Sequence, residues 1–223
     1  LLLSLAAPRS CPEIRIRACI EGCAALGEAH GAPLLGGDLT AHHGGLSLVV
    51  TALGDAPDDP PGRDRGQAGD AILLTGPVGG SGLGRHLDLV PRLVAGRALH
   101  AAGLRAMMDV SDGLALDLFR LARASGLVAE LESVTVHPDA ERAAGARSAL
   151  DHALFDGEDH ELLAAGPPAA LVDFLAAPEG AGCHRIGHLR APLAGEQPGL
   201  VLRLGPSPRP FDPADPRAFV HGR

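Results

Sequence analysis

The spacing of apolar residues along the chain predicts a mixture of strands and helices. The apolar run at 1–8 predicts a strand, and the helical spacing of apolar residues over 12–29 predicts a helix that ends at His30-Gly31. Further strands are expected at 46–53, 70–75, 128–136, 161–165 and 200–204, and further helices near 138–148 and 168–176. Strands interspersed with helices indicate an α/β or α+β architecture.

Another helix is expected directly after Asp112. Its end is predicted at Ser125-Gly126, because Gly commonly follows the last turn of a helix. One face of this helix is apolar and is expected to lie in the core; it carries Leu114, Leu118, Leu121 and Ala122.

The polar segment 55–66, which contains three Pro and two Gly, interrupts the apolar pattern. It predicts a linker between a domain at 1–56 and a domain at 66–223. The Gly-rich segment 76–84 follows a predicted strand, but it does not match Gly-x-Gly-x-x-Gly and no Gly-Lys-Ser/Thr follows it. A plain turn from strand to helix is therefore favoured over a dinucleotide site.

Composition excludes several classes of protein. With 46% hydrophobic residues in 223, the chain can form a substantial core, but it has neither Trp nor Tyr and a net charge of −8. Nucleic-acid binding is not expected, because that function uses a basic face and aromatic stacking. All nineteen basic residues are Arg. The lack of Lys excludes P-loop enzymes, the protein-kinase fold and Schiff-base chemistry.

The four cysteines, Cys11, Cys19, Cys23 and Cys183, include no Cys-x-x-Cys pair. They are interpreted as buried, reduced thiols, in preference to a zinc site or a disulfide framework. No apolar run approaches the roughly 20 residues of a membrane span, so a cytoplasmic protein is expected. The apolar N-terminus is interpreted as a strand cut at its start, since a signal peptide would have a basic region before it.

The segment Asp109-Val-Ser-Asp112 places two carboxylates where a strand gives way to a helix. Two such charges repel by ~4 kcal/mol at about 4 Å and an effective dielectric near 20, so a divalent cation is expected between them. Ser111 is expected to cap the helix, so that its hydroxyl and the first-turn amides point toward a bound anion. The alternative is an ordinary helix cap with an acidic residue in the first turn.

Two further acidic segments have open interpretations. Gly36-Gly37-Asp38 is typical of a loop between a helix and a strand, but it could also bring backbone and carboxylate to a phosphate and its metal. The segment 156–161 is either a solvated acidic turn or a ligand loop, for which Gly157 gives room. Arg63 lies in the predicted linker, and it is interpreted either as a surface charge or as a nucleotide contact. Hydrolase chemistry is disfavoured, because Gly-x-Ser-x-Gly and His-Glu-x-x-His are both absent from the sequence.

In this order the motifs resemble the thiamine-monophosphate kinase family of the aminoimidazole ribonucleotide synthetase superfamily. The resemblance implies a two-domain α/β (α+β) fold, with mixed sheets, flanking helices and an incomplete N-terminal domain. It also implies ATP-dependent phosphorylation of thiamine monophosphate by direct transfer with Mg²⁺, in a homodimer whose strands share a barrel. The matching segments are Gly36-Gly37-Asp38, Arg63 before Gly69-Asp70 and Leu74-Thr75-Gly76, 108–114, 157–163, Arg185-Ile-Gly187 and the closing segment 217–221.

The resemblance also implies roles for individual residues, with no catalytic residue beyond the metal and phosphate ligands. Nucleotide contacts are expected from Gly37, Asp38, Arg63 and Ser111, Mg²⁺ ligation from Asp38, Asp109 and Asp112, and substrate contacts from Glu158 and Phe219. The chain departs from the family at His160, where Tyr or Phe is usual, and at Leu39, where Thr is common.

Two other functions fit the same residues. One is another ATP-dependent enzyme of the superfamily, such as a synthetase acting on a purine-precursor or selenium substrate. The other is a nucleotide-binding fragment without activity, because the family's upstream acidic motifs and its substrate-binding His segment have no counterpart here.

The absence of these motifs leads to a first prediction. In the family, the upstream acidic motifs hold much of the metal cluster. The 223-residue chain alone is expected to have little or no kinase activity. An assay of ADP release by the purified chain, with thiamine monophosphate as acceptor, measures this. Efficient turnover would refute it.

Overall fold

The computed structural model describes residues 1–56, 58–215 and 217. The chain divides into two compact units, Leu1–Asp59 and Pro60–Arg223, each of which is described by itself. The division falls within 55–66, the segment whose composition indicates a linker.

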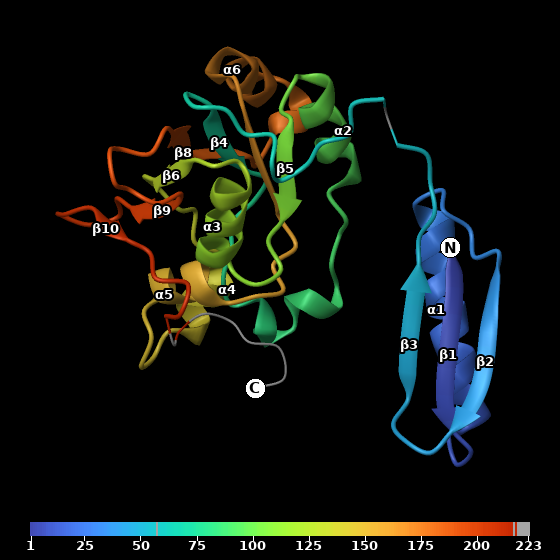
Figure 1. The fold of residues 1–223 in the computed structure, drawn as a ribbon. Coiled ribbons are helices and arrows are strands. Elements are labelled where there is room, and N and C mark those ends of the chain that lie inside the picture. The colour runs from blue at the N-terminus through green and yellow to red at the C-terminus, as the bar shows by residue number, and fades with distance from the viewer. Residues whose placement is uncertain (57, 216, 218–223) are drawn as a thin grey trace. The chain divides into compact units, whose positions relative to one another are not determined.

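The first unit is a three-stranded sheet with one helix (Figure 1). Its elements are β1 (Leu2–Pro8), α1 (Glu13–Ala29), β2 (Gly36–His42) and β3 (Ser47–Thr51). The strand and helix predicted at the N-terminus are confirmed. β1 is the central strand, with β2 parallel and β3 antiparallel to it. Leu3, Leu5 and Ala7 alternate along β1 and are buried, as expected for a strand with one covered face.

The Gly-Gly-Asp segment lies in a strand, which corrects the loop interpretation. β2 begins at Gly36 and pairs with β1, so that Gly37 faces Leu3 and Asp38 faces Ser4. A side chain at Gly37 would place its Cβ 1.8 Å from the carbonyl oxygen of Leu3. Glycine is therefore required here for the close approach of two strands.

The second unit is built around a seven-stranded sheet of order β10-β9-β6-β8-β4-β7-β5, in which only β6 and β9 among the described pairs run parallel. Its strands are β4 (Ala71–Leu74), β5 (Ala106–Asp109), β6 (Val128–Leu131), β7 (Leu162–Gly166), β8 (His184–Arg190), β9 (Gly199–Leu202) and β10 (Arg209–Pro210). Its helices are α2 (Leu93–Ala101), α3 (Leu114–Ala124), α4 (Pro138–Ala143), α5 (Ala149–Phe155) and α6 (Pro168–Ala176), and 3₁₀ turns occupy Ser81–Leu83, Arg85–Leu87 and Pro178–Gly180.

This sheet has apolar clusters on both faces. Ile72 and Leu74 of β4 belong to a cluster with residues of α3 and α5, whereas Ala71 and Leu73 belong to one with residues of α2 and α6. All of β4 is therefore buried, which explains why it is a continuous apolar run in the sequence. The predicted apolar face of α3 is confirmed, since Leu114, Leu118, Leu121 and Ala122 are fully buried.

Several predicted boundaries differ from the structure. The expected strand at 128–136 ends at Leu131, and the expected helix at 138–148 is the short α4, followed by α5. Ser148 starts this second helix, because its hydroxyl and the Asp151 carboxylate form a capping box. β8 was not predicted, since it contains many charged or titratable residues and a glycine, Gly187, that packs closely against the backbone of Glu130.

The thiol prediction is only partly correct. All four cysteines are free, but only Cys183 is buried, and Cys11, Cys19 and Cys23 are partly exposed. Among the described residues, no helix combines the length and the apolar character that crossing a membrane requires.

A buried carboxylate joins three neighbouring strands of this sheet. Glu130 of β6 is 5% exposed and accepts hydrogen bonds from Arg190 of β8 and from Arg203, which follows β9. The two guanidinium groups, Arg203 first, lower the pKa of Glu130 from 4.5 to about 2, although burial opposes them. Its negative charge therefore stabilises the folded sheet.

Replacing this carboxylate tests the contribution. Because the folded pKa lies below the ordinary value of 4.5, the stabilisation is complete above that pH and is lost as pH falls toward about 2. Glu130→Gln is expected to lower the free energy of unfolding by about 2 to 3 kcal/mol at neutral pH. Circular dichroism suits the measurement, since the chain has no Trp or Tyr. A loss that does not shrink toward acid pH would contradict this account.

Candidate active site

The turn between β5 and α3 holds the first group of expected site residues. Asp109 ends β5, as predicted, and its side chain is 52% exposed. α3 begins at Leu114 after Gly113, and no side chain caps it. The expected Ser111 cap is therefore wrong, since the helix begins farther along the chain.

A buried carboxylate from within the helix shapes this turn instead. Asp117 is 0% exposed, and its Oδ2 accepts the backbone N–H groups of Ser111 at 3.0 Å and Asp112 at 2.8 Å. Of the amides expected in the first turn, that of Asp112 is therefore bonded to the protein itself. Burial raises the pKa of Asp117, while the hydrogen bonds from Asp112 and Arg120 oppose that shift.

The acidic loop 156–161 lies against the same turn. Glu158 donates its backbone N–H to the carbonyl oxygen of Ser111 at 2.9 Å, and His160 donates to that of Val110 at 2.7 Å. The structure thus brings Glu158 beside the Asp109–Asp112 segment. The ring of His160 lies between two expected site residues: Nδ1 is 3.6 Å from an Asp109 oxygen and Nε2 is 3.2 Å from a Glu158 oxygen.

The backbone of this loop is unusual. Glu158 and His160 have φ values of 67° and 51°, in the left-handed region that residues other than glycine rarely adopt. Such conformations persist only where the surroundings fix them, and they concentrate at functional sites. The surroundings here are the turn after β5 and the Gly-rich turn after β4.

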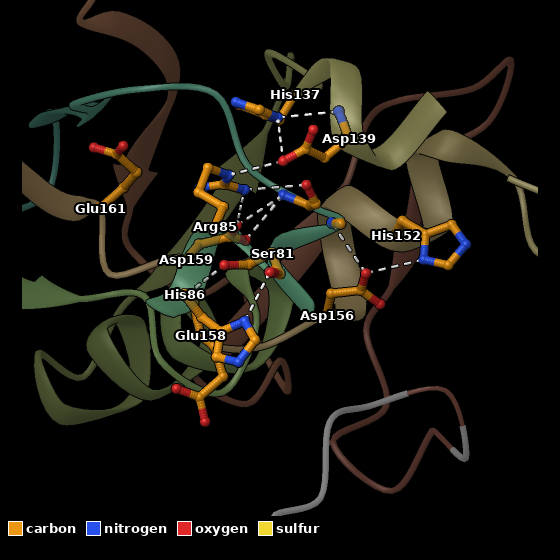
Figure 2. Close-up of polar contacts among 12 residues, drawn as sticks. Ser81, Arg85, His86, His137, Asp139, His152, Asp156, Glu158, Asp159 and Glu161 are labelled. Carbon is orange, nitrogen blue, oxygen red and sulfur yellow. Dashed lines mark hydrogen bonds and ion pairs between the residues drawn. The ribbon is translucent and has the colours of Figure 1, made fainter. Parts of the chain in front are cut away.

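The Gly-rich turn binds the acidic loop through its backbone amides (Figure 2). Gly79 N–H donates to the Asp159 carboxylate at 2.9 Å, and Gly80 N–H donates to Asp156 Oδ2 at 3.1 Å. The Ser81 hydroxyl donates to the carbonyl oxygen of Glu158 at 2.7 Å. The expected plain turn is thus observed, and in this structure its amides meet carboxylates of the same chain.

Arginine side chains complete this support. Arg85 donates to Asp159 at 2.7 Å and lies between that carboxylate and Asp139 (Figure 2). Arg92 binds Glu161 with two nitrogens, at 2.5 and 2.8 Å. Asp159 and Glu161 are 1% and 4% exposed, so the interpretation as a solvated acidic turn is wrong for them. Burial raises the pKa of Asp159 to about 6, against the opposing effects of Arg85 and Gly79.

A depression of about 390 Å³ lies beside Glu158. Its lining includes His86, Asp156 and Gly157. The Nδ1 of His86 lies 2.9 Å from the carbonyl oxygen of Ser81, so this nitrogen carries the proton and donates.

Asp38 and Gly37 lie in the first unit, on β2. The Thr40 hydroxyl donates to Asp38 Oδ2 at 2.8 Å. Both expected residues line a depression of about 340 Å³ whose other walls are mainly apolar side chains, such as Leu5 and Ile20. A mostly apolar hollow with one carboxylate is typical of a small-molecule site.

Arg63 is not brought near the other expected residues of its unit. Its side chain is exposed, and its carbonyl oxygen accepts a hydrogen bond from Ser125. Ser125 follows the last residue of α3, whereas Asp112 precedes the first. A helix of this length separates them by roughly 16 Å. Phe219, the expected substrate contact, lies outside the described residues.

The residues at the β5–α3 turn fit a magnesium ion. Mg²⁺ is usually bound by one or two carboxylates together with water and substrate phosphates, so Asp109 and Asp112 are a sufficient protein contribution. The only cluster of three potential ligands found in the described part of the chain is Glu130, Glu132 and His188. Glu130 is already paired there with two arginines, which disfavours a cation.

Sequence reasoning missed Asp117, Arg120, Ser81, Arg85 and His86. A signal existed for Asp117, because this charged residue shares the apolar face of α3 with Leu114 and Leu121. An acidic residue on a buried helical face requires partners, which indicates a structural role. The contacts of Ser81 and Arg85 join segments more than seventy residues apart, and no local pattern indicates such contacts.

Comparison with known proteins gives consistent results. The chain is 35% identical over 209 residues to the thiamine-monophosphate kinase of Rhodopirellula baltica, covering 91% of this chain and 63% of that protein. A crystal structure of thiamine-monophosphate kinase from Stenotrophomonas maltophilia matches 90% of this chain and 71% of that one, with 29% identity and a TM-score of 0.73. A structure of AaThiL complexed with AMPPCP and TMP matches 99% of this chain and 72% of that one, with 22% identity and a TM-score of 0.67. No protein-family model matches the chain.

These matches confirm the resemblance and the fold class, because the likeness to the kinases extends over most of the described residues. The chain spans less than two thirds of the length of the Rhodopirellula kinase.

Two glycines of one turn provide a matched test of the loop's support. Gly80 has a φ of 74°, and a Cβ there would lie 2.4 Å from the backbone of Asp139, whereas a Cβ at Gly82 meets nothing within 4 Å. Gly80→Ala is expected to lower the free energy of unfolding by about 2 kcal/mol or more. Gly82→Ala is expected to change it by less than about 0.5 kcal/mol. Equal effects in denaturant titrations would show that the turn is not closely packed.

Proposed function

We propose that this chain, a homologue of the thiamine-monophosphate kinases, serves the ATP-dependent phosphorylation of thiamine monophosphate to thiamine diphosphate. One observation carries the proposal: in a kinase homologue, the Asp109–Asp112 turn and Glu158 are held together by backbone hydrogen bonds. The first segment supplies metal ligands, and the second supplies a substrate contact. The reaction class comes from the likeness to the kinases.

Mg²⁺ is the cofactor in this proposal, with Asp38 as the ligand in the first unit and Asp109 and Asp112 as the ligands in the second. When bound, it neutralises charge on the phosphates during transfer. This role is consistent with a chain that has no Lys, because phosphoryl transfer depends on positioning and charge neutralisation more than on covalent chemistry of the protein. The protein's own task at this turn is to keep the carboxylates in place.

ATP is proposed to contact Gly37, Asp38, Arg63 and Ser111. The mainly apolar depression beside Asp38 supports a nucleotide there, since an apolar hollow can accept a planar base. Arg63 is exposed and positively charged, which suits a contact with phosphate.

Thiamine monophosphate is proposed to contact Glu158 and Phe219. The thiazolium ring of thiamine is a cation, so a carboxylate is a suitable partner for it. The Glu158 side chain is 37% exposed at the edge of the depression shared with His86, and its backbone is held by Ser81 and Ser111. An anchored backbone places the carboxylate without further loss of conformational freedom.

A cytoplasmic homodimer completes the proposal. Apolar side chains of the sheet in the first unit are 49 to 58% exposed, among them Leu39 and Val50 on one face and Val49 on the other. Exposed apolar side chains of this kind are typical of a surface that another protein covers. Sedimentation of the protein at several concentrations measures the oligomeric state.

The function is tested by substituting the metal ligand at the end of β5. Asp109→Asn is expected to weaken Mg²⁺-dependent binding of ATP and to reduce turnover by orders of magnitude, because it removes a charged ligand. Asp173→Asn, an exposed position on α6, is the matched control and should leave both unchanged. The measurements are calorimetry with ATP and magnesium, and release of ADP, on the chain and on any longer product of its gene.

Two outcomes would contradict the proposal. Wild-type rates in Asp109→Asn would rule out the metal role of this residue. Turnover with a purine precursor or a selenium compound, and none with thiamine monophosphate, would assign the chain to another activity.

A further inference from the structure

We infer that Arg120 is a counter-ion that occupies Asp112 in the cation-free protein and is displaced when a divalent cation binds this carboxylate. The inference deepens the proposed function, on which it depends for the role of Asp112 as a metal ligand. The competition between Arg120 and the cation is a separate property and can be measured without turnover.

One nitrogen of Arg120 joins two carboxylates. Arg120 Nη1 donates to Asp117 Oδ1 at 2.9 Å and also to Asp112 Oδ2. One guanidinium therefore contacts both the expected metal ligand, which precedes α3, and the carboxylate within α3 that shapes the turn. The guanidinium takes an oxygen of Asp112 that a metal ion would otherwise use.

The three side chains differ in their freedom to move. Asp117 is completely buried, and its second oxygen is fixed by the amides of Ser111 and Asp112. The Asp112 side chain is 19% exposed and that of Arg120 is 40% exposed. Arg120 can therefore move toward solvent from Asp112 and keep its bond to Asp117, while the turn keeps its shape.

A cation at Asp112 disfavours the observed contact for two reasons. The metal ion and the guanidinium require lone pairs of the same carboxylate, and their positive charges repel each other at contact distance. Arg120 and the cation therefore compete for this carboxylate. Removal of the guanidinium should make the cation bind more tightly.

The experiment compares two arginines of one helix. Arg120→Gln removes the positive charge and keeps an amide that can donate to Asp117. Arg123→Gln removes the same charge three residues further along, where the guanidinium lies over the Phe119 ring, 5.6 Å from its centroid. The probe is Mn²⁺, whose free concentration in a titration of the chain is read by electron paramagnetic resonance.

The expected result is a gain in Mn²⁺ affinity on the order of tenfold for Arg120→Gln relative to Arg123→Gln. Adding Asp112→Asn to Arg120→Gln should abolish the gain, which connects it to this carboxylate. Equal affinities in the two arginine variants would overturn the inference, and so would weaker binding by Arg120→Gln, because Arg120 would then be positioning Asp112 for the metal.

Two further measurements separate other causes. Circular dichroism melting identifies a variant that does not fold; in that case Arg120→Lys replaces it, with a smaller gain expected because an ammonium group still repels the cation. If it too gains no affinity over Arg123→Gln, the inference is overturned. A Mn²⁺ gain in a protein that does not phosphorylate thiamine monophosphate would contradict the proposed function alone.

Discussion

The candidate site depends on buried carboxylates that are fully hydrogen bonded. Asp117 accepts two backbone amides and one guanidinium, and Asp159 accepts the amide of Gly79 and the guanidinium of Arg85. An uncompensated buried charge costs several kcal/mol. Loss of the hydrogen-bond partners of either carboxylate would therefore destabilise the fold. Each carboxylate therefore fixes the loop whose amides it binds, and the exposed side chains of that loop take their positions from it.

Local sequence patterns were sufficient where structure depends on local interactions. The apolar run at 1–8 and the apolar face of α3 predicted those elements correctly, and the end of β5 placed Asp109 at a strand terminus. β8 was missed because its pairing with β6, and not its composition, makes it a strand. At Gly187 the backbone of Glu130 lies so close that no side chain larger than hydrogen fits. The support of Glu158 by Ser81 joins positions 77 residues apart, which no local pattern contains.

The Gly-rich turn shows why a motif alone was ambiguous. Free backbone N–H groups bind a phosphate or a carboxylate equally well, since both are anions with accepting oxygens. The sequence of the turn indicated that backbone N–H groups are available to bind an anion, but it did not indicate which anion. Asp159, 80 residues from Gly79, supplies that partner from within the chain. The close packing of Gly79 and Gly80 against the backbone of neighbouring segments adds a reason for the glycines of this turn.

Burial and arginine partners divide the acidic residues of the site into two groups. Asp117, Asp159 and Glu161 are at most 4% exposed and have guanidinium partners, so they act within the protein. The side chains of Asp109 and Glu158 are 52% and 37% exposed, and the ring of His160 lies within 3.6 Å of an oxygen of each. These two exposed side chains, and Asp112 beside Arg120, are the ones proposed to meet the metal and the substrate, whereas the buried carboxylates hold the loops that carry them.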